Sequence, residues 1–156
     1  MLFRSIPSFV KPVAIIFLIS SLLSAQDFYL CTRVIDGDTI IVEIDSKQER
    51  VRLIGVDTPE TVHPNKPVEY FGKEASEFTK RMVEGKEVRL EFDWQRRDKY
   101  GRLLAYVYLQ DGTFLNAEII KQGYGFAYTR FPFKYLEEFR SYERGARENG
   151  RGLWGK

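Results

Sequence analysis

Residues 28–57 read FYLCTRVIDGDTIIVEIDSKQERVRLIGVD, and this stretch decides the fold. Apolar and β-branched residues fill it, and two short turn sequences rich in Asp, Gly, Ser and Lys interrupt it. The pattern predicts three strands, over residues 28–35, 39–44 and 50–56. The first two should pair as a hairpin across the turn Asp36-Gly37-Asp38. In the third, Arg50 and Arg52 alternate with Val51 and Leu53, which predicts a half-buried strand with both arginines on one face.

The rest of the chain adds one helix before two more strands. Apolar residues recur at helical spacing from Phe71 to Met82, and alternation then predicts strands over 88–92 and 103–109. Asn116 is expected to cap a short helix that Gly123 closes, with Leu115 and Ile120 as its hydrophobic staple, and a last helix should start near Leu136. Five strands and three helices indicate an α+β, mainly β domain. An OB-fold barrel fits this order, although an SH3-like barrel or another α+β fold stays open.

The N-terminus has the pattern of an export signal. Arg4 and Lys11 precede the apolar run Val13–Ala25, which is too short to cross a bilayer as a helix. We expect residues 1–25 to be a signal peptide cleaved after Ala25, and residues 26–156 to form the folded domain. The protein would then be secreted or periplasmic. The alternative is an uncleaved segment that anchors it at the cell surface, so a membrane would be a partner only in that case.

Composition excludes several classes of site. The 156 residues include one Cys and one His, His63, which rules out an internal disulfide framework, a four-Cys zinc site and an HExxH protease. Lys and Arg number 24 against 22 Asp and Glu, and both basic residues of the predicted signal would be lost on cleavage. The remaining chain has no net charge. Any anionic substrate must therefore be bound by locally placed cations or by a metal.

Two acidic motifs follow neighbouring strands. Asp36-Gly37-Asp38-Thr39 is by itself only a common hairpin turn, and Val56-Asp57-Thr58-Pro59-Glu60 by itself only a Pro-containing turn. Together they place Asp38 and Asp57 at the ends of adjacent strands, where their carboxylates can bind one hard cation with a backbone carbonyl. Calcium suits an oxygen-only ligand set. A third motif, Asp98-Lys99-Tyr100-Gly101-Arg102, reads as a polar turn that ends in an arginine.

The order of IDGDT, RLIGVDTPET, DKYGRLLAYVY and a late GLW resembles the staphylococcal nuclease, or thermonuclease, family. The likeness extends from about Cys31 to Trp154. It implies an OB-fold phosphodiesterase that uses Ca²⁺ to cleave DNA and RNA. We expect the protein to be a monomer. The expected attack is at the 5′ O–P bond and leaves 3′-phosphate ends.

The resemblance also implies roles for six residues. The metal ligands would be Asp38, Asp57 and the carbonyl of Thr58, and the catalytic residues would be Arg52, Glu60 and Arg102. Two guanidiniums and a divalent cation can stabilise the charge that develops on the phosphate oxygens. The rival interpretation is a binding module, a nuclease-like domain that has lost its catalytic residues. Here the Asp/Asp/Glu and Arg/Arg sets are complete.

Substrate contacts follow from the same resemblance, on Lys66, Lys99, Tyr100 and Tyr128. Aromatic faces accept any base by stacking, and lysines suit the phosphate path. Each of these residues is equally typical of an ordinary surface or packing position. The chain departs from the family at Arg130, where a second tyrosine is common, and the segment 93–97 is one residue shorter than in the family's best-known member.

Overall fold

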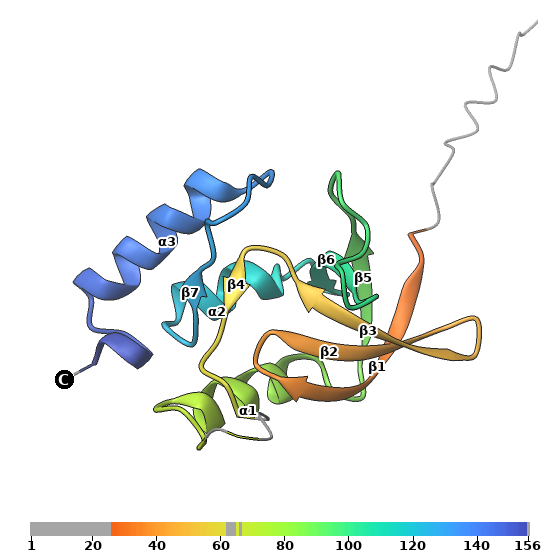
Figure 1. Ribbon diagram of the computed structural model, residues 1–156, viewed down its shortest axis with the longest axis horizontal. Coiled ribbons are helices and arrows are strands. Elements are labelled where there is room, and N and C mark those ends of the chain that lie inside the picture. Colours follow the sequence, from red (N-terminus) through yellow and green to blue (C-terminus); the bar gives the residue numbers. More distant parts are fainter. Residues whose placement is uncertain (1–25, 62–64, 66, 156) are drawn as a thin grey trace, which may run out of the picture.

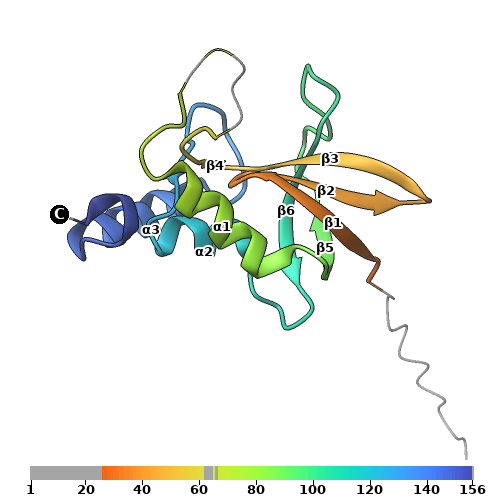
Figure 2. The ribbon, with the colours of Figure 1, turned by 90° about the horizontal axis from the view of Figure 1, so that it is seen from below.

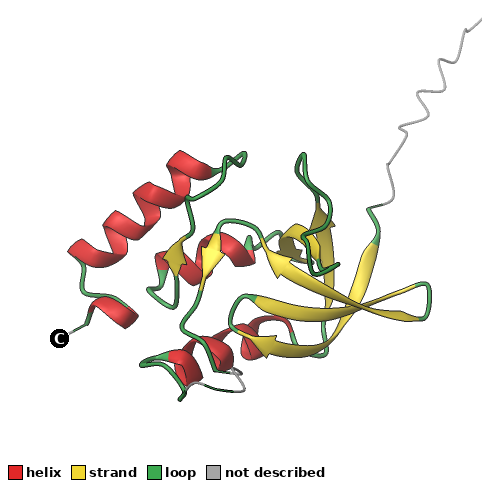
Figure 3. Cartoon of the chain, in the orientation of Figure 1, coloured by secondary structure: helices red, strands yellow, loops and turns green. Residues whose placement is uncertain are grey.

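The computed structural model describes residues 26–61, 65 and 67–155. The predicted signal segment, His63 and Lys66 lie outside the described residues. Within that part, five strands close a barrel in the order β1-β2-β3-β6-β5, and three helices pack around it (Figures 1 and 3). The fold is therefore the predicted OB-fold barrel with three helices.

The barrel strands follow the alternation of the sequence. Their bounds are β1 Phe28–Asp36, β2 Thr39–Ile44, β3 Lys47–Leu53, β5 Glu87–Glu91 and β6 Leu103–Leu109. Antiparallel pairing joins β1 to β2 and β2 to β3, and Thr39 lies opposite Arg52 in the latter pair. The barrel closes through a parallel pair, β3 with β6, in which Arg52 lies opposite Leu104. Val51 and Leu53 point into the core, whereas Arg50 is exposed and Arg52 only half-buried, as the alternation predicts.

The predicted third strand is broken in two. Residues 50–56 do not form one strand, because the chain turns at Ile54 and Gly55, and Gly55 has a φ of 72° that favours glycine. A short strand β4, Val56–Asp57, then pairs with β7, Phe126–Ala127, in a separate two-stranded sheet. Asp57 therefore leaves the barrel and lies beside the segment that leads to Tyr128.

The helices are α1 Gly72–Val83, α2 Leu115–Lys121 and α3 Leu136–Glu148, followed by a 3-10 turn, η1 Gly152–Trp154. Figure 1 shows α2 and α3 side by side, away from the β2–β3 turn, and Figure 2 shows α1 crossing in front of them. Phe139 of α3 is fully buried against α2 and the barrel residues. None of the helices in the described ranges is long and apolar enough to cross a membrane.

Asn116 does not cap α2, so that prediction is wrong. The residue before the helix is Phe114, which makes no side-chain cap, and Asn116 lies fully buried inside α2. Its side-chain oxygen accepts a hydrogen bond from the Val107 amide (2.9 Å), and its amide nitrogen donates to the carbonyls of Ile54 (2.9 Å) and Ala105 (3.3 Å). The polar side chain thus joins α2 to β6 and to the turn after β3.

Candidate active site

The two acidic motifs meet at one end of the barrel, around Arg52. The Nη2 atom of Arg52 lies 3.0 Å from Oδ2 of Asp38 and 3.2 Å from Oδ1 of Asp57. Its Nη1 atom donates to the carbonyls of Leu53 (3.1 Å) and Val56 (2.6 Å). These bonds fix the guanidinium across the turn between β3 and β4. The two carboxylates expected to bind a metal therefore converge on one nitrogen of the Arg52 guanidinium.

The Asp38 side chain is buried and hydrogen-bonded through both of its carboxylate oxygens. Its Oδ1 accepts from the Thr39 hydroxyl (3.0 Å), and its Oδ2 accepts from the backbone amide of Thr58 (2.9 Å). Gly37 makes this approach possible, because a methyl group at residue 37 would lie 2.7 Å from Oγ1 of Thr58. The Thr58 hydroxyl is itself buried and has no hydrogen-bond partner among the described residues.

The donor set fits a hard cation. Burial and the negative charge of Asp38 raise the pKa of Asp57 above its ordinary value, although the Arg52 charge opposes the shift. A cation would relieve this repulsion between carboxylates. Among the described residues no three His, Cys, Asp or Glu side chains are grouped as a metal cage. A metal would accordingly be bound by two carboxylates together with backbone and water oxygens, an arrangement that calcium accepts.

Glu60 follows Asp57 by three residues and is positioned by a closed loop. Its backbone amide donates to the Glu69 carboxylate (3.0 Å) and its carbonyl accepts from the Glu69 amide (3.0 Å), so residues 60 and 69 form the base of the loop. Its side chain is hydrogen-bonded to Asp36. Glu60 is thus brought to the same end of the barrel as Asp38 and Asp57.

Asp36 is a site residue that the sequence analysis missed. It is buried at the end of β1, and its Oδ1 accepts from the Gly37 amide (2.8 Å) and the Thr61 hydroxyl (3.1 Å). Burial, reinforced by the hydrogen bond with Glu60, raises its pKa to about 7. The signal was present in the sequence, because Asp36 is the first residue of the Asp36-Gly37-Asp38 turn, but the pattern alone favoured a simple turn residue.

Arg102 reaches the site from the start of β6. Its Nε donates to Oδ2 of Asp98 at 2.7 Å, and this bond spans the predicted turn. Although burial alone would raise the pKa of Asp98, hydrogen bonds from Arg102 and the turn amides lower it, so the carboxylate stays ionised and holds the guanidinium. Tyr100 is flanked by Lys99, whose Nζ lies 5.0 Å from the ring centroid, and by Arg102 at 5.5 Å.

One cleft of about 680 Å³ contains most of the predicted site. Its lining includes both arginines, one predicted metal ligand and the three described residues predicted to contact substrate, namely Arg52, Arg102, Asp57, Lys99, Tyr100 and Tyr128. Trp94, Arg130 and Phe131 also line it, and the sequence analysis gave no role to Trp94 or Phe131. Trp94 and Phe131 lie in two loops far apart in the sequence, so only the folded structure shows that they line the same cleft.

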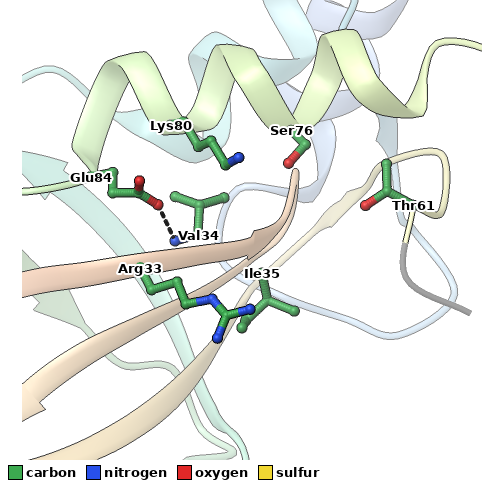
Figure 4. Close-up of a pocket in the computed structure, with 7 residues that line it drawn as sticks. All are labelled: Arg33, Val34, Ile35, Thr61, Ser76, Lys80 and Glu84. Atoms are coloured by element: carbon green, nitrogen blue, oxygen red, sulfur yellow. Dashed lines mark hydrogen bonds between the residues drawn. The ribbon is translucent and has the colours of Figure 1, made fainter.

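A second hollow lies between β1 and α1 (Figure 4). Figure 4 shows the side chains of Ser76, Lys80 and Glu84 on the helix side, and Glu84 accepts a hydrogen bond from the Val34 amide at 2.7 Å. Arg33 points away from the helix. Neither predicted catalytic arginine lines this hollow, whereas both line the cleft described above. Asp38, Thr58 and Glu60 line neither of these two hollows.

The sequence was also compared with families and individual proteins of known kind. The family described as staphylococcal nuclease homologue matches residues 50–156. The chain is 50% identical over 130 residues to a thermonuclease of Staphylococcus hyicus, covering 83% of this chain and 76% of that protein. It is 60% identical over 95 residues to a thermonuclease of Staphylococcus intermedius, covering 61% and 56% respectively. It is 45% identical over 127 residues to the endonuclease YncB of Bacillus subtilis (strain 168), covering 80% and 60%. The chain therefore belongs to the family of staphylococcal nuclease homologues.

Proposed function

We propose that this protein is a calcium-dependent nuclease that hydrolyses DNA and RNA by attack at the 5′ O–P bond, leaving 3′-phosphate ends. Membership of the family makes it a nuclease, a phosphodiesterase hydrolase. One observation carries the proposal furthest. A single nitrogen of Arg52 contacts both Asp38 and Asp57. A guanidinium suited to phosphate and two carboxylates suited to a cation are therefore in direct contact.

Asp38, Asp57 and the Thr58 carbonyl would hold the calcium ion. When bound, the ion supplies positive charge to the phosphate oxygens and a site at which water can be held. Arg52 and Arg102 lie in the same cleft. Arg102 binds Asp98 through Nε and keeps both terminal nitrogens for two phosphate oxygens, whereas Nη2 of Arg52 would turn from Asp38 and Asp57 to the phosphate once a cation holds these carboxylates. Both arginines stabilise the negative charge that grows on the phosphate as the bond to the leaving oxygen breaks.

Glu60 is the residue that accepts the proton of the attacking water. Its loop is fixed at Glu69, and Asp36 offers a second carboxyl group within hydrogen-bonding distance. General-base assistance of this kind contributes about 10²–10⁴-fold to a rate. Glu60 therefore orients and activates water, whereas the arginines act on the phosphate.

We further propose that the protein is exported as a monomer, with residues 1–25 removed. The charge pattern of the N-terminal segment supports this proposal. Retention of the segment would instead tether the enzyme to the cell surface. N-terminal sequencing of the protein from culture medium and membrane fractions separates the two outcomes.

Digestion of plasmid and of heat-denatured DNA and RNA tests the activity. The protein should cleave with calcium, lose activity in excess chelator and regain it when calcium is restored. Glu60→Gln should lower the turnover number by about 100-fold or more, and mass spectrometry of the products should find 3′-phosphate ends. Binding of nucleic acid without cleavage under all these conditions would instead favour the binding-module interpretation, and activity in chelator would contradict the calcium requirement.

A further inference from the structure

We propose that Trp94 and Phe131 form a second base-stacking subsite next to the catalytic cleft, which binds a base of an unpaired nucleic acid strand. The inference rests on the proposed nuclease function and concerns substrate binding away from the reacting phosphate. Trp94 lies in the loop after β5, and Phe131 lies in the loop after β7. Figure 1 shows these two loops facing each other above the barrel.

Both rings are largely exposed to solvent. Trp94 is 68% exposed and Phe131 is 58% exposed, while the buried core is filled by other residues. Both line the cleft that holds Arg52 and Arg102. The Phe131 ring lies 6.2 Å from that of Tyr128, which lines the same cleft. Large apolar surface gathered at the edge of a binding cleft indicates an interaction site.

The loop that carries Trp94 is hydrogen-bonded to the loop that carries Phe131 before any substrate binds. The indole Nε1 of Trp94 donates to the Pro132 carbonyl at 3.0 Å, so the edge of the indole is fixed beside Phe131. Asp93 accepts from the amides of Trp94 (2.8 Å) and Lys134 (2.9 Å) and from the hydroxyl of the buried Tyr106. Because the loops are bonded to each other and to the barrel, little conformational entropy is lost when a base binds.

The cleft is lined by four basic side chains and by the carboxylates of Asp57, Asp93 and Asp98, and Lys99 and Arg130 are the two cations of the lining that form no ion pair in the described part of the chain. These two unpaired cations favour an anionic strand as the occupant. Lys99, Arg130 and the two catalytic arginines line it together with the rings. Arg130, exposed next to Phe131, forms no ion pair with any other residue in the described ranges. Cations beside exposed aromatic faces are the combination by which proteins bind single strands without reading sequence.

The strand must be unpaired where it meets this subsite. In a duplex both faces of each base are already covered by neighbouring bases, so an aromatic ring gains no contact unless the stack is opened. A single strand exposes its bases and can follow the cations from the catalytic centre toward Arg130. Deoxyribose and ribose strands have the same stacking faces, so the subsite should accept both.

Tryptophan fluorescence provides a direct test, because the chain has only two tryptophans, Trp94 and Trp154. In a Trp154→Phe background, with EDTA to keep the oligonucleotides intact, the emission of Trp94 should be quenched by an unpaired thymidine octamer and by a uridine octamer. An octamer with the same phosphates but no bases, and a hairpin duplex, should leave the emission nearly unchanged. Equal quenching by the base-free octamer or the duplex would overturn the proposal.

Variants then measure the contribution of each ring, with the Kd read from the fluorescence anisotropy of a dye-labelled octamer, because substitutions of Trp94 remove the intrinsic fluorophore. Trp94→Ala and Phe131→Ala should each raise the Kd for the thymidine octamer by about fivefold to 100-fold, which is the usual effect of losing one stacked base. Neither should change the Kd for the base-free octamer more than about twofold. Loss of affinity for both octamers alike, or for neither, would contradict a stacking role.

Two controls separate stacking from loop structure. Trp94→Phe retains an aromatic face but removes the N–H that binds Pro132, so its Kd should stay within about threefold of the parent. Tyr70→Ala removes an equally exposed ring (76%) that does not line the cleft, and should have no effect. If the protein binds the octamers as expected but does not cleave with calcium, only the proposed function is refuted. If it cleaves but Trp94→Ala and Phe131→Ala leave the Kd for the thymidine octamer unchanged, only this subsite is refuted.

Discussion

Arg52 contacts the backbone with one terminal nitrogen of its guanidinium and the carboxylates with the other. Nη1 holds the turn between β3 and β4 through two carbonyls, and Nη2 contacts Asp38 and Asp57. A lysine ammonium is a single point and cannot take up both positions. Arg52 therefore determines the shape of the site as well as its charge.

Arg52→Lys should consequently lower the turnover number by about 100-fold or more, because one fixed electrostatic donor is lost and the turn is released. Steady-state kinetics on denatured DNA measure the effect. Arg50→Lys is the matched control, since Arg50 lies two residues earlier on the same strand and is exposed. A turnover number for Arg52→Lys within a few-fold of the parent would exclude a role for this arginine in the transition state.

Asp93 provides a pH-dependent contribution to stability. Burial alone would raise its pKa, but hydrogen bonds from Tyr106, Lys134 and Trp94 bring the pKa below the ordinary 3.8. A lowered carboxyl pKa stabilises the fold above the unfolded value and loses its effect as the pH falls through the folded value. Asp93→Asn should lower the free energy of unfolding by about 1–3 kcal/mol near neutral pH.

The destabilisation caused by Asp93→Asn should become smaller as the pH falls below about 4. Urea unfolding of parent and variant across this range measures it, with Asp27→Asn as a control at an exposed position before β1. A destabilisation that stays constant down to the lowest pH would show that packing, and not the charge, is responsible.

At the scale of elements, α2 is joined to the barrel by one polar residue. Asn116 satisfies the amide of Val107 and the carbonyls of Ile54 and Ala105, all in a buried region. Asn116→Leu removes the side-chain partner of the Val107 amide and of the Ile54 carbonyl, while the Ala105 carbonyl keeps its bond from the Ile54 amide (3.0 Å). The variant should cost about 2 kcal/mol or more. Denaturant unfolding tests this. Asn149→Ala, at the exposed end of α3, should change stability by less than about 0.5 kcal/mol, and an equal loss in both variants would argue against the bridging role.

The elements also show what the sequence could and could not predict. Alternation located the barrel strands because each has one face toward the core, and the Asp-Gly turn predicted the first hairpin correctly. Alternation does not depend on the partner strand, so the parallel pairing of β3 with β6 was not predictable. The break at Gly55 was missed for a related reason. Val56 is buried in the separate strand β4, and a valine would also suit one continuous strand over residues 50–56, so the sequence pattern does not distinguish the two. Asn116 looked like a cap since its residue type is common there, whereas its real partners come from distant strands.

For the whole molecule, nucleic acid binding depends on where charges lie. Basic and acidic side chains of residues 26–156 are equal in number, yet Arg52, Lys99, Arg102 and Arg130 line one cleft. Each phosphate of a single strand that is neutralised contributes about −0.7 to the slope of log affinity against log salt. The slope for an unpaired octamer should therefore be negative and no steeper than about −3.

Fluorescence titrations at several KCl concentrations measure this slope. Arg130→Gln should make it shallower by about 0.7, whereas Arg144→Gln, on α3 and outside the cleft, should leave it unchanged. A slope much steeper than about −3 would mean that cations beyond the cleft bind the strand.

The small sheet of β4 and β7 links two parts of the site that are far apart in sequence. Asp57 lies opposite Phe126, and the Tyr128 amide donates to the Gly55 carbonyl at 2.9 Å. The segment of the predicted metal ligand Asp57 and the segment of Tyr128 are therefore the two sides of one ribbon, and neither has another strand to pair with in the described part of the chain. Local unfolding that separates the ribbon must release both segments together. In hydrogen exchange, the amides that join them should accordingly open as one cooperative unit, with a common rate that is independent of the barrel.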